Sequence, residues 1–227
     1  MNSSESQLFS PMSDSSVPEH LASYADSILG LRKVGNQFWS RGWSLGTSSN
    51  YSVLVDRDPL TLLLTASGKD KGHLQGSDFV LVDGDGKPTV AGQQKSSAET
   101  LLHCLAVKRC NAGAVLHTHS VWSTVLSEHY FSLRGLWIEG FEMLKGLEGI
   151  TTHETRYWLP IFNNTQDIPA LAAEVASYLD SNPNTLCLGY LIRQHGLYTW
   201  GKDLPSAVRH MEVIEFLLEC IGRKSKL

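Results

Sequence analysis

One stretch, Gly113 to Ser120, restricts the fold more than any other part of the chain. Its sequence, GAVLHTHS, runs from small and apolar residues into two histidines separated by a single residue. A short apolar run of this kind predicts a buried β-strand, and strand side chains alternate between two faces. His117 and His119 are therefore expected on one face and Thr118 on the other. Two imidazoles on one face, where a buried strand ends, are typical of a metal site with an open edge.

Length and composition indicate one globular domain. The 227 residues are 42% hydrophobic and include six tryptophans, which is enough to bury a substantial core and excludes a disordered protein. The net charge of −4 argues against nucleic-acid binding, and no apolar run reaches the roughly 18 residues of a membrane span. The four cysteines form no C-x-x-C pair, which favours reduced thiols in a cytosolic protein. We expect a disordered serine-rich leader at 1–16 and one catalytic domain at 17–227.

Helical and strand patterns alternate irregularly, with short turns between several strands. Helical periodicity is present at 17–43, 101–110, 120–127, 171–179 and 204–221, and strand patterns at 51–55, 60–65, 79–82, 113–118 and 185–200. This order predicts an α/β fold with a mixed sheet flanked by helices, in preference to a doubly wound parallel sheet. Ser96 or Ser97 is expected to cap the helix that follows them.

Three loops rich in hydroxyl groups and glycine allow two interpretations. They are Leu45–Ser52, Ala66–Lys69 and Lys95–Ser97, and each lies where a regular element begins or ends. Backbone N–H groups and hydroxyls in such loops can bind a phosphate, and a helix N-terminus favours an anion. Ordinary turns and a helix cap explain the same residues without a ligand.

A third metal ligand has to come from another segment. His195 follows Arg193-Gln194 where an apolar strand ends, and it is the best candidate for the third ligand. On the residues alone, Glu142 is a solvated charge paired with Lys145 three residues later. The other histidines are expected to be surface or packing residues: His20, His73, His103, His129, His153 and His210.

Taken together, these motifs resemble the class II sugar-phosphate aldolase family. The resemblance covers roughly 37–220 and rests on GTSSN at 46–50, SG at 67–68, KSS at 95–97, HTHS at 117–120 and RQHG at 193–196. Within the family, FEMLKG at 141–146 and HGLYTWG at 195–201 are similar to the branch that dehydrates a methylthio-sugar phosphate in methionine salvage. The family implies a single-domain three-layer α/β/α fold with a mixed, largely antiparallel sheet. It also implies a homotetramer with active sites near subunit interfaces.

The resemblance also assigns roles to residues. His117, His119 and His195 would bind one zinc ion per chain, and Glu142 would be the acid/base, a role suited to a glutamate whose pKa is raised by partial burial. The substrate, a small sugar phosphate, would bind through its phosphate to Thr47, Ser48, Ser49, Asn50, Ser67, Gly68, Lys95, Ser96, Ser97 and Ala98.

Two departures from the aldolase pattern leave other functions open. Ser49 stands where the aldolases have glycine, and Ala98 stands where they have the second serine of a Ser-Ser-Glu turn. Glu99 then matches the acid/base of the aldolases and is a rival to Glu142. The alternatives to a dehydratase are a zinc-dependent aldolase or epimerase and a non-enzymatic interaction domain. The three retained histidines count against the interaction domain.

Overall fold

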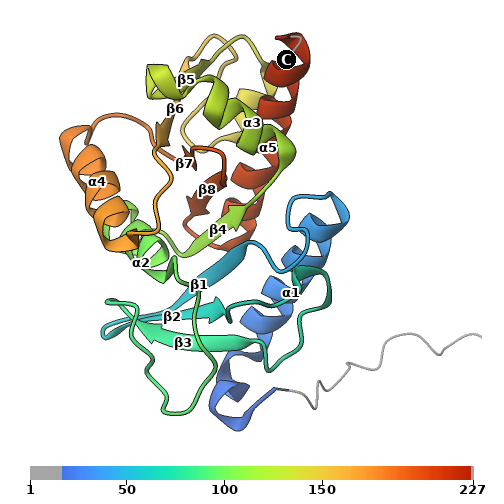
Figure 1. Cartoon of the computed structure of the whole chain (residues 1–227), viewed down its shortest axis with the longest axis vertical. Coiled ribbons are helices and arrows are strands. Elements are labelled where there is room, and N and C mark those ends of the chain that lie inside the picture. Colours follow the sequence, from blue (N-terminus) through green and yellow to red (C-terminus); the bar gives the residue numbers. More distant parts are fainter. Residues whose placement is uncertain (1–16, 226–227) are drawn as a thin grey trace, which may run out of the picture.

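A mixed sheet forms the centre of the protein. The structure, a computed structural model, describes residues 17–225, so the leader predicted at 1–16 lies outside the described part. The strand order is β3-β2-β1-β4-β8-β7-β6-β5 (Figure 1). Neighbouring strands are antiparallel except for β6 and β7, which are parallel. The strands are β1 (Asn50–Arg57), β2 (Leu60–Thr65), β3 (Phe79–Asp83), β4 (Ala114–Thr118), β5 (Gly135–Ile138), β6 (Tyr157–Phe162), β7 (Gly189–Ile192) and β8 (Gly196–Gly201).

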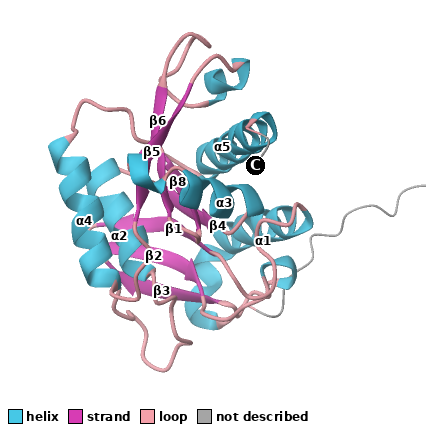
Figure 2. Cartoon of the chain, turned by 45° about the horizontal axis from the view of Figure 1, so that its top comes forward, coloured by secondary structure: helices cyan, strands magenta, loops and turns pink. Residues whose placement is uncertain are grey.

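Helices cover both faces of the sheet, which confirms the predicted α/β architecture. Figure 2 shows α2 and α4 on one side of the strands and α1, α3 and α5 on the other. The α-helices are α1 (Ala25–Ser40), α2 (Thr100–Cys110), α3 (Val121–His129), α4 (Ile168–Ser181) and α5 (Leu204–Lys224). The 3₁₀ helices are η1 (Glu19–Tyr24), η2 (Lys71–His73), η3 (Phe131–Leu133) and η4 (Glu142–Gly146).

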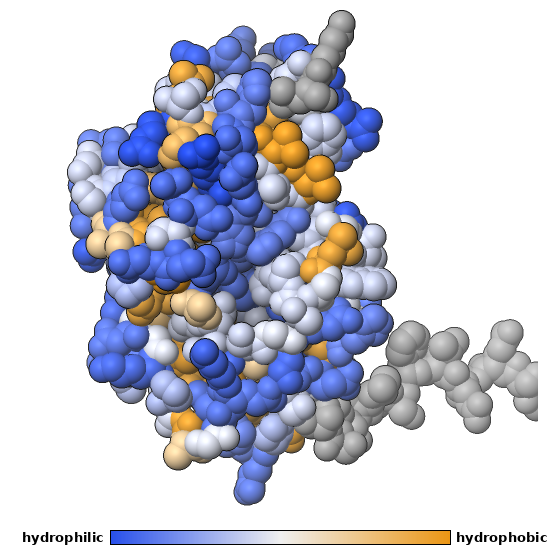
Figure 3. All heavy atoms as spheres, in the orientation of Figure 1, coloured by the Kyte–Doolittle hydropathy of each residue, from blue (hydrophilic) through white to orange (hydrophobic). Residues whose placement is uncertain are grey.

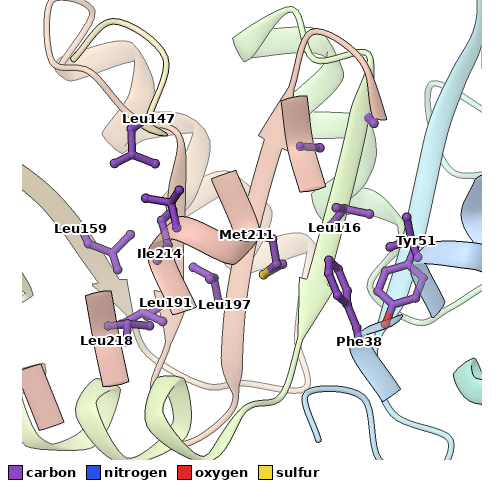
Figure 4. Packing of buried hydrophobic residues seen from close by; sticks show 14 of the residues in the cluster. Phe38, Tyr51, Leu116, Leu147, Leu159, Leu191, Leu197, Met211, Ile214 and Leu218 are labelled. Atoms are coloured by element: carbon purple, nitrogen blue, oxygen red, sulfur yellow. The ribbon is translucent and has the colours of Figure 1, made fainter. Parts of the chain in front are cut away.

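Each face of the sheet has its own hydrophobic core. Phe38 of α1, Leu116 of β4 and Met211 of α5 belong to one cluster, part of which is shown in Figure 4. Leu102 of α2 and Val175 of α4 belong to the cluster on the opposite face. Successive side chains along a strand point to opposite faces of the sheet, so the apolar residues of each strand are divided between the two clusters.

The same alternation positions the histidines of β4. Leu116 lies in the core beside α5 and Val115 in the core beside α2, so His117 faces α2 and Thr118 faces α5. The Thr118 hydroxyl indeed donates to Glu215 Oε1 of α5 at 2.8 Å. After the strand ends, the His119 backbone N–H donates to the carbonyl of Trp43 at 2.8 Å. The predicted strand, with two histidines on one face and Thr118 on the other, is confirmed.

Burial of Glu215 beneath β4 should make stability depend on pH. Burial raises the pKa of Glu215 to about 7, whereas an unfolded glutamate titrates near 4.3. Between these values the folded chain holds a proton that the unfolded chain has released, so the free energy of unfolding falls as pH rises. Glu215→Gln should remove this loss, which is on the order of 3 kcal/mol.

Urea unfolding of metal-free protein at several pH values measures this effect. The wild type should lose stability relative to Glu215→Gln between about pH 4.5 and pH 7. Glu174→Gln, which changes an exposed carboxylate on α4, is the matched control and should keep the wild-type slope. Parallel pH profiles for wild type and Glu215→Gln would contradict the raised pKa.

One face of the protein is largely polar (Figure 3), and the cysteines form no disulfide in the described part of the chain. Figure 3 shows a largely hydrophilic face on which hydrophobic side chains form separate patches. Within residues 17–225, no helix combines the length and the apolar character needed to cross a membrane. All four cysteines, Cys104, Cys110, Cys187 and Cys220, are unpaired, as their spacing predicted.

Candidate metal centre and active site

Three histidines from two parts of the chain converge at the end of β4. The Nε2 atoms of His117 and His119 are 2.7 Å apart, and the Nε2 atom of His195 lies 3.4 and 3.1 Å from them. His195 lies in the turn between β7 and β8, and β8 pairs with β4, so sheet pairing brings the two motifs together. The third member of the predicted set is therefore in contact with the first two.

Neighbouring groups fix the orientation of His117 and leave its Nε2 free for a ligand. Its Nδ1 donates to the carbonyl of Leu197 at 3.0 Å, and its ring stacks on Tyr198 with centroids 4.0 Å apart. With the proton on Nδ1, the lone pair of Nε2 points at the other two imidazoles. A hydrogen bond fixes the backbone of His195, because the Thr124 hydroxyl donates to the His195 carbonyl oxygen at 3.0 Å.

The chemistry of this cluster fits a divalent metal ion. Burial, together with the neighbouring imidazoles, holds the pKa of His117 well below its usual range, and burial lowers that of His119 to about 4. Neutral imidazoles are the form that binds metal. Tetrahedral zinc with bonds of 2.0–2.1 Å separates its nitrogen ligands by about 3.3 Å. The two distances to His195, 3.1 and 3.4 Å, are close to this value, whereas the 2.7 Å between His117 and His119 is shorter. Among the described residues these three histidines form a possible metal-binding group.

Glu99 is the acidic side chain nearest to the histidines. Its Oε2 lies 3.6 Å from His117 Nε2 and its Oε1 lies 3.5 Å from His195 Nε2. The side chain of Asn50 donates to the same Oε2 at 2.9 Å. Glu99 is also the N-cap residue of α2, without a side-chain capping bond. The carboxylate is therefore directed to the metal centre.

The predicted cap of α2 is wrong, because neither Ser96 nor Ser97 occupies the N-cap position. The Ser97 hydroxyl instead accepts the backbone N–H of Glu99 and the Asn50 amide, both at 3.2 Å. Ser96 forms a backbone bridge with Ala66. These contacts bring the start of α2 against the end of β2 and draw two of the predicted phosphate loops together.

A small polar cavity joins the predicted phosphate loops to the metal centre. Its volume is about 160 Å³, and it is bordered by Glu99 and His119. Most of the predicted phosphate-binding residues also line it: Thr47, Ser48, Ser49, Asn50, Ser67, Gly68 and Ser97. Lys95, Ser96 and Ala98 are adjacent in sequence but do not line it. A larger cavity of about 540 Å³ lies beside Cys110, Leu179 and Trp200 and includes none of the predicted site residues.

The backbone of the first two loops, Leu45–Ser52 and Ala66–Lys69, is suited to phosphate binding. Gly46, Ser49 and Gly68 all have positive φ, at 65°, 71° and 71°. Left-handed residues turn successive N–H groups toward one side, which is how backbone amides form an anion-binding concavity. Ser49 adopts this conformation although it has a side chain, at the position where the sequence departs from the aldolase glycine.

Glu142 occupies the solvated environment that its spacing from Lys145 predicts, and not the partly buried one expected for an acid/base with a raised pKa. It begins η4, and its side chain is 68% exposed and ion-paired with Lys145. His153 Nδ1 lies 3.4 Å from its other oxygen. The hydrogen bond and charge of Lys145 lower the pKa of Glu142, whereas partial burial was expected to raise it. Within the described chain no hydrogen bond or ion pair joins Glu142 to the three histidines.

Comparison with known proteins assigns the chain to a family. Residues 30–221 match the family described as Class II Aldolase and Adducin N-terminal domain. The chain therefore belongs to the class II aldolase and adducin family. An L-fuculose 1-phosphate aldolase has the same fold, with a TM-score of 0.71 and 24% identity over 92% of this chain and 90% of that one.

More similar relatives lie in one branch of the family. A methylthioribulose-1-phosphate dehydratase of Hahella chejuensis is 48% identical over 83% of this chain and 88% of its own length. The protein of that name from Pseudomonas syringae pv. tomato is 49% identical over 83% of this chain and 90% of its own length. The Marinobacter nauticus dehydratase is 45% identical over 87% of this chain and 93% of its own. The resemblance in the sequence motifs is thus confirmed across most of the chain.

Proposed function

We propose that this protein is a metal-dependent hydro-lyase, a methylthioribulose-1-phosphate dehydratase of methionine salvage that works in the cytosol. It would convert 5-methylthioribulose 1-phosphate to a 2,3-diketo-5-methylthiopentyl 1-phosphate. The observation that carries the proposal is the 45–49% identity to dehydratases over more than four-fifths of the chain. Convergence of the three histidines supports a catalytic role over a purely structural one.

The reaction needs a proton acceptor and a proton donor beside a polarised ketone. A proton leaves the carbon next to the ketone, and the hydroxyl on the following carbon departs with a proton as water. The resulting enol becomes the second ketone. A bound divalent metal supplies Lewis acidity at a ketone oxygen. We infer that His117, His119 and His195 hold that metal and that it is zinc, one ion per chain, because three neutral nitrogen donors suit a catalytic zinc site.

Glu142 is the proposed acid/base in this reaction. A carboxyl group can take the carbon-bound proton and return one to the departing hydroxyl. The hydrogen bond and charge of Lys145 lower the pKa of Glu142, so the carboxyl group is ionised and able to accept a proton, but the lowering makes it a weaker base than an unpaired glutamate. Its segment, Phe141–Gly146, is one of the two that resemble the dehydratases.

The polar cavity is the proposed phosphate site. Ser67 and Ser97 line it with Gly68 and the loop at 47–50, and hydrogen bonds to a charged group contribute about 1.5–3 kcal/mol. Ser67→Ala and Ser97→Ala should each raise KM for the phosphorylated substrate by roughly 10–100-fold with a smaller change in kcat. Steady-state kinetics measures this effect. Ser225→Ala, at the far end of α5, is the control. An unchanged KM with lowered thermal stability would show that these serines are only structural.

A zinc-dependent aldolase or epimerase is the second candidate function. The position of Glu99, with one oxygen near each of two histidines, favours this alternative because an aldolase would use a base there. Turnover of a panel of ketose and aldose phosphates separates the candidates. The dehydratase proposal requires the methylthio-ketose phosphate to have the highest kcat/KM, and preference for a different sugar phosphate would overturn it.

We also propose a homotetramer with active sites near the subunit interfaces. Support comes from α3, which begins directly after His119 and Ser120 and exposes Val121 and Val125, 69% and 43% accessible. Exposed apolar side chains beside a site are suited to contact with a second subunit. Light scattering after size-exclusion chromatography should give four times the chain mass, and a monomer at micromolar concentration would contradict the proposal.

A further inference from the structure

A buried chain of hydrogen bonds leads from β1 through α2 to the metal centre. The Ser52 hydroxyl lies 2.7 Å from Nδ1 of His103, and Nε2 of His103 contacts Oδ1 of Asn50. Asn50 Nδ2 then donates to Oε2 of Glu99 at 2.9 Å. His103 and Ser52 are completely buried, and Asn50 is 5% exposed. No sequence motif links His103 to the predicted site, and the connection arises only from the folding of the chain.

Sheet register explains why these groups meet. Asn50 lies directly opposite His117 in the antiparallel pair of β1 and β4. Ser52, two residues later, is on the same face of β1 as Asn50. That face is covered by α2, whose His103 inserts between the two side chains. The chain of hydrogen bonds is thus built into the junction between the metal-binding strand and its neighbour.

Every hydrogen bond in this chain has a defined direction. A carboxylate only accepts, so Asn50 must turn its NH₂ group toward Glu99 and its oxygen toward His103. His103 therefore carries its proton on Nε2 and accepts from the Ser52 hydroxyl at Nδ1. Burial lowers the pKa of His103 to about 3, which keeps the ring neutral with a single N–H. Each donor points toward Glu99.

We propose that His103 is a positioning residue for Glu99. Through the amide of Asn50, it fixes the Glu99 carboxylate with one oxygen toward His117 and the other toward His195. Loss of the His103 N–H removes the partner of the Asn50 oxygen and leaves only the Ser97 hydroxyl to orient the amide. Because a hydroxyl can also donate, the amide can then rotate and present its oxygen to the carboxylate. Glu99 then loses the hydrogen bond from the Asn50 NH₂ group and is repelled by the Asn50 oxygen. Its carboxylate is no longer held in place beside the three histidines. This inference rests on the metal site of the proposed function, but it does not depend on the substrate.

Zinc affinity measured by competition with a chelator tests the proposal without substrate. Partners that orient the groups around a metal typically contribute 10–100-fold to metal affinity or activity. His103→Leu should weaken zinc binding and lower kcat within that range. His103→Gln, whose amide NH₂ can replace the Nε2 donor, should recover most of the loss. A purely structural histidine would not be rescued through its donor in this way.

A double-mutant cycle shows whether His103 acts through Glu99. In a Glu99→Ala background, His103→Leu should change zinc affinity and kcat by less than about twofold, because the group that it positions is gone. His210→Leu is the matched control. That histidine is also completely buried and makes two hydrogen bonds, to Trp200 and Glu148. It should lower thermal stability and leave zinc affinity and kcat unchanged.

The outcomes separate this proposal from the proposed function. Equal losses from His103→Leu in the wild-type and Glu99→Ala backgrounds would overturn the positioning role, as would unaltered zinc affinity in a folded His103→Leu. If that variant does not fold, Ser52→Ala replaces it in the cycle, because it removes the hydroxyl that holds the other side of the His103 ring at Nδ1. A Ser52→Ala loss that is also equal in both backgrounds would overturn the proposal. Coupling in zinc affinity without any dehydratase activity would leave this inference standing and reject the proposed function.

Discussion

His195→Ala should lose most of its zinc and its activity. Structural zinc sites bind with about 10–16 kcal/mol, so each of four ligands supplies about 2.5–4 kcal/mol, or roughly 10²–10³-fold in affinity. The Nε2 of His195 lies within 3.4 Å of both other histidine nitrogens, and the described chain has no further histidine in the group to replace it. Elemental analysis should find about one zinc per wild-type chain and far less in the variant.

An exposed histidine provides the control for that experiment. His129 is accessible at the end of α3, so His129→Ala should retain the wild-type zinc content and kcat. His119→Ala should behave like His195→Ala. Full metal and full activity in His195→Ala would mean that the third ligand has been misassigned.

Glu142→Gln should cause the largest fall in kcat among variants that keep the metal. Glutamine has nearly the same shape but cannot accept or return a proton, and loss of general acid–base catalysis typically costs 10²–10⁴-fold. Glu142 has no hydrogen bond or ion pair with the metal-binding histidines in the described chain, so zinc content should not change. Zinc analysis combined with single-turnover kinetics measures both quantities.

Glu99→Gln and Glu139→Gln distinguish Glu142 from its rivals. Glu139 is exposed and paired with Arg156, and its variant should be close to wild type. Glu99→Gln should lower kcat less than Glu142→Gln and should weaken zinc binding, because Glu99 faces two of the histidines. If Glu99 proves indispensable for turnover while Glu142→Gln is fully active, the acid/base assignment fails.

Features with a local pattern could be predicted from the sequence. The pattern at 60–65 predicted both bounds of β2. Ser120, where the helical pattern at 120–127 begins, is the N-cap of α3, and its side chain accepts the backbone N–H of Ser123. The two histidines of β4 share a face because strand side chains alternate. His195 could be nominated from its position at the end of an apolar strand, but its contact with the others depends on the pairing of β8 with β4.

Features that depend on distant parts of the chain could not be predicted. His103 was expected at the surface or in packing, whereas its two partners, Ser52 and Asn50, precede it by 51 and 53 residues. Lys71 lies in a short 3₁₀ helix and resembles a surface cation in the sequence. It is only 1% exposed, and burial lowers its pKa to about 8. For Glu142 the spacing from Lys145 predicted a solvated charge, but the burial expected of an acid/base was wrong, because η4 packs on α5 through residues other than Glu142, among them Gly146 against Val213.

The mass of the product tests the central claim most directly. Zinc-loaded protein is incubated with 5-methylthioribulose 1-phosphate, and the phosphorylated products are identified by mass spectrometry. A dehydratase must yield one phosphorylated product that is lighter than the substrate by one water and keeps every carbon. Two shorter fragments would show that the carbon chain is cut, and a product of unchanged mass would show epimerisation. Either of these results would contradict the dehydratase assignment.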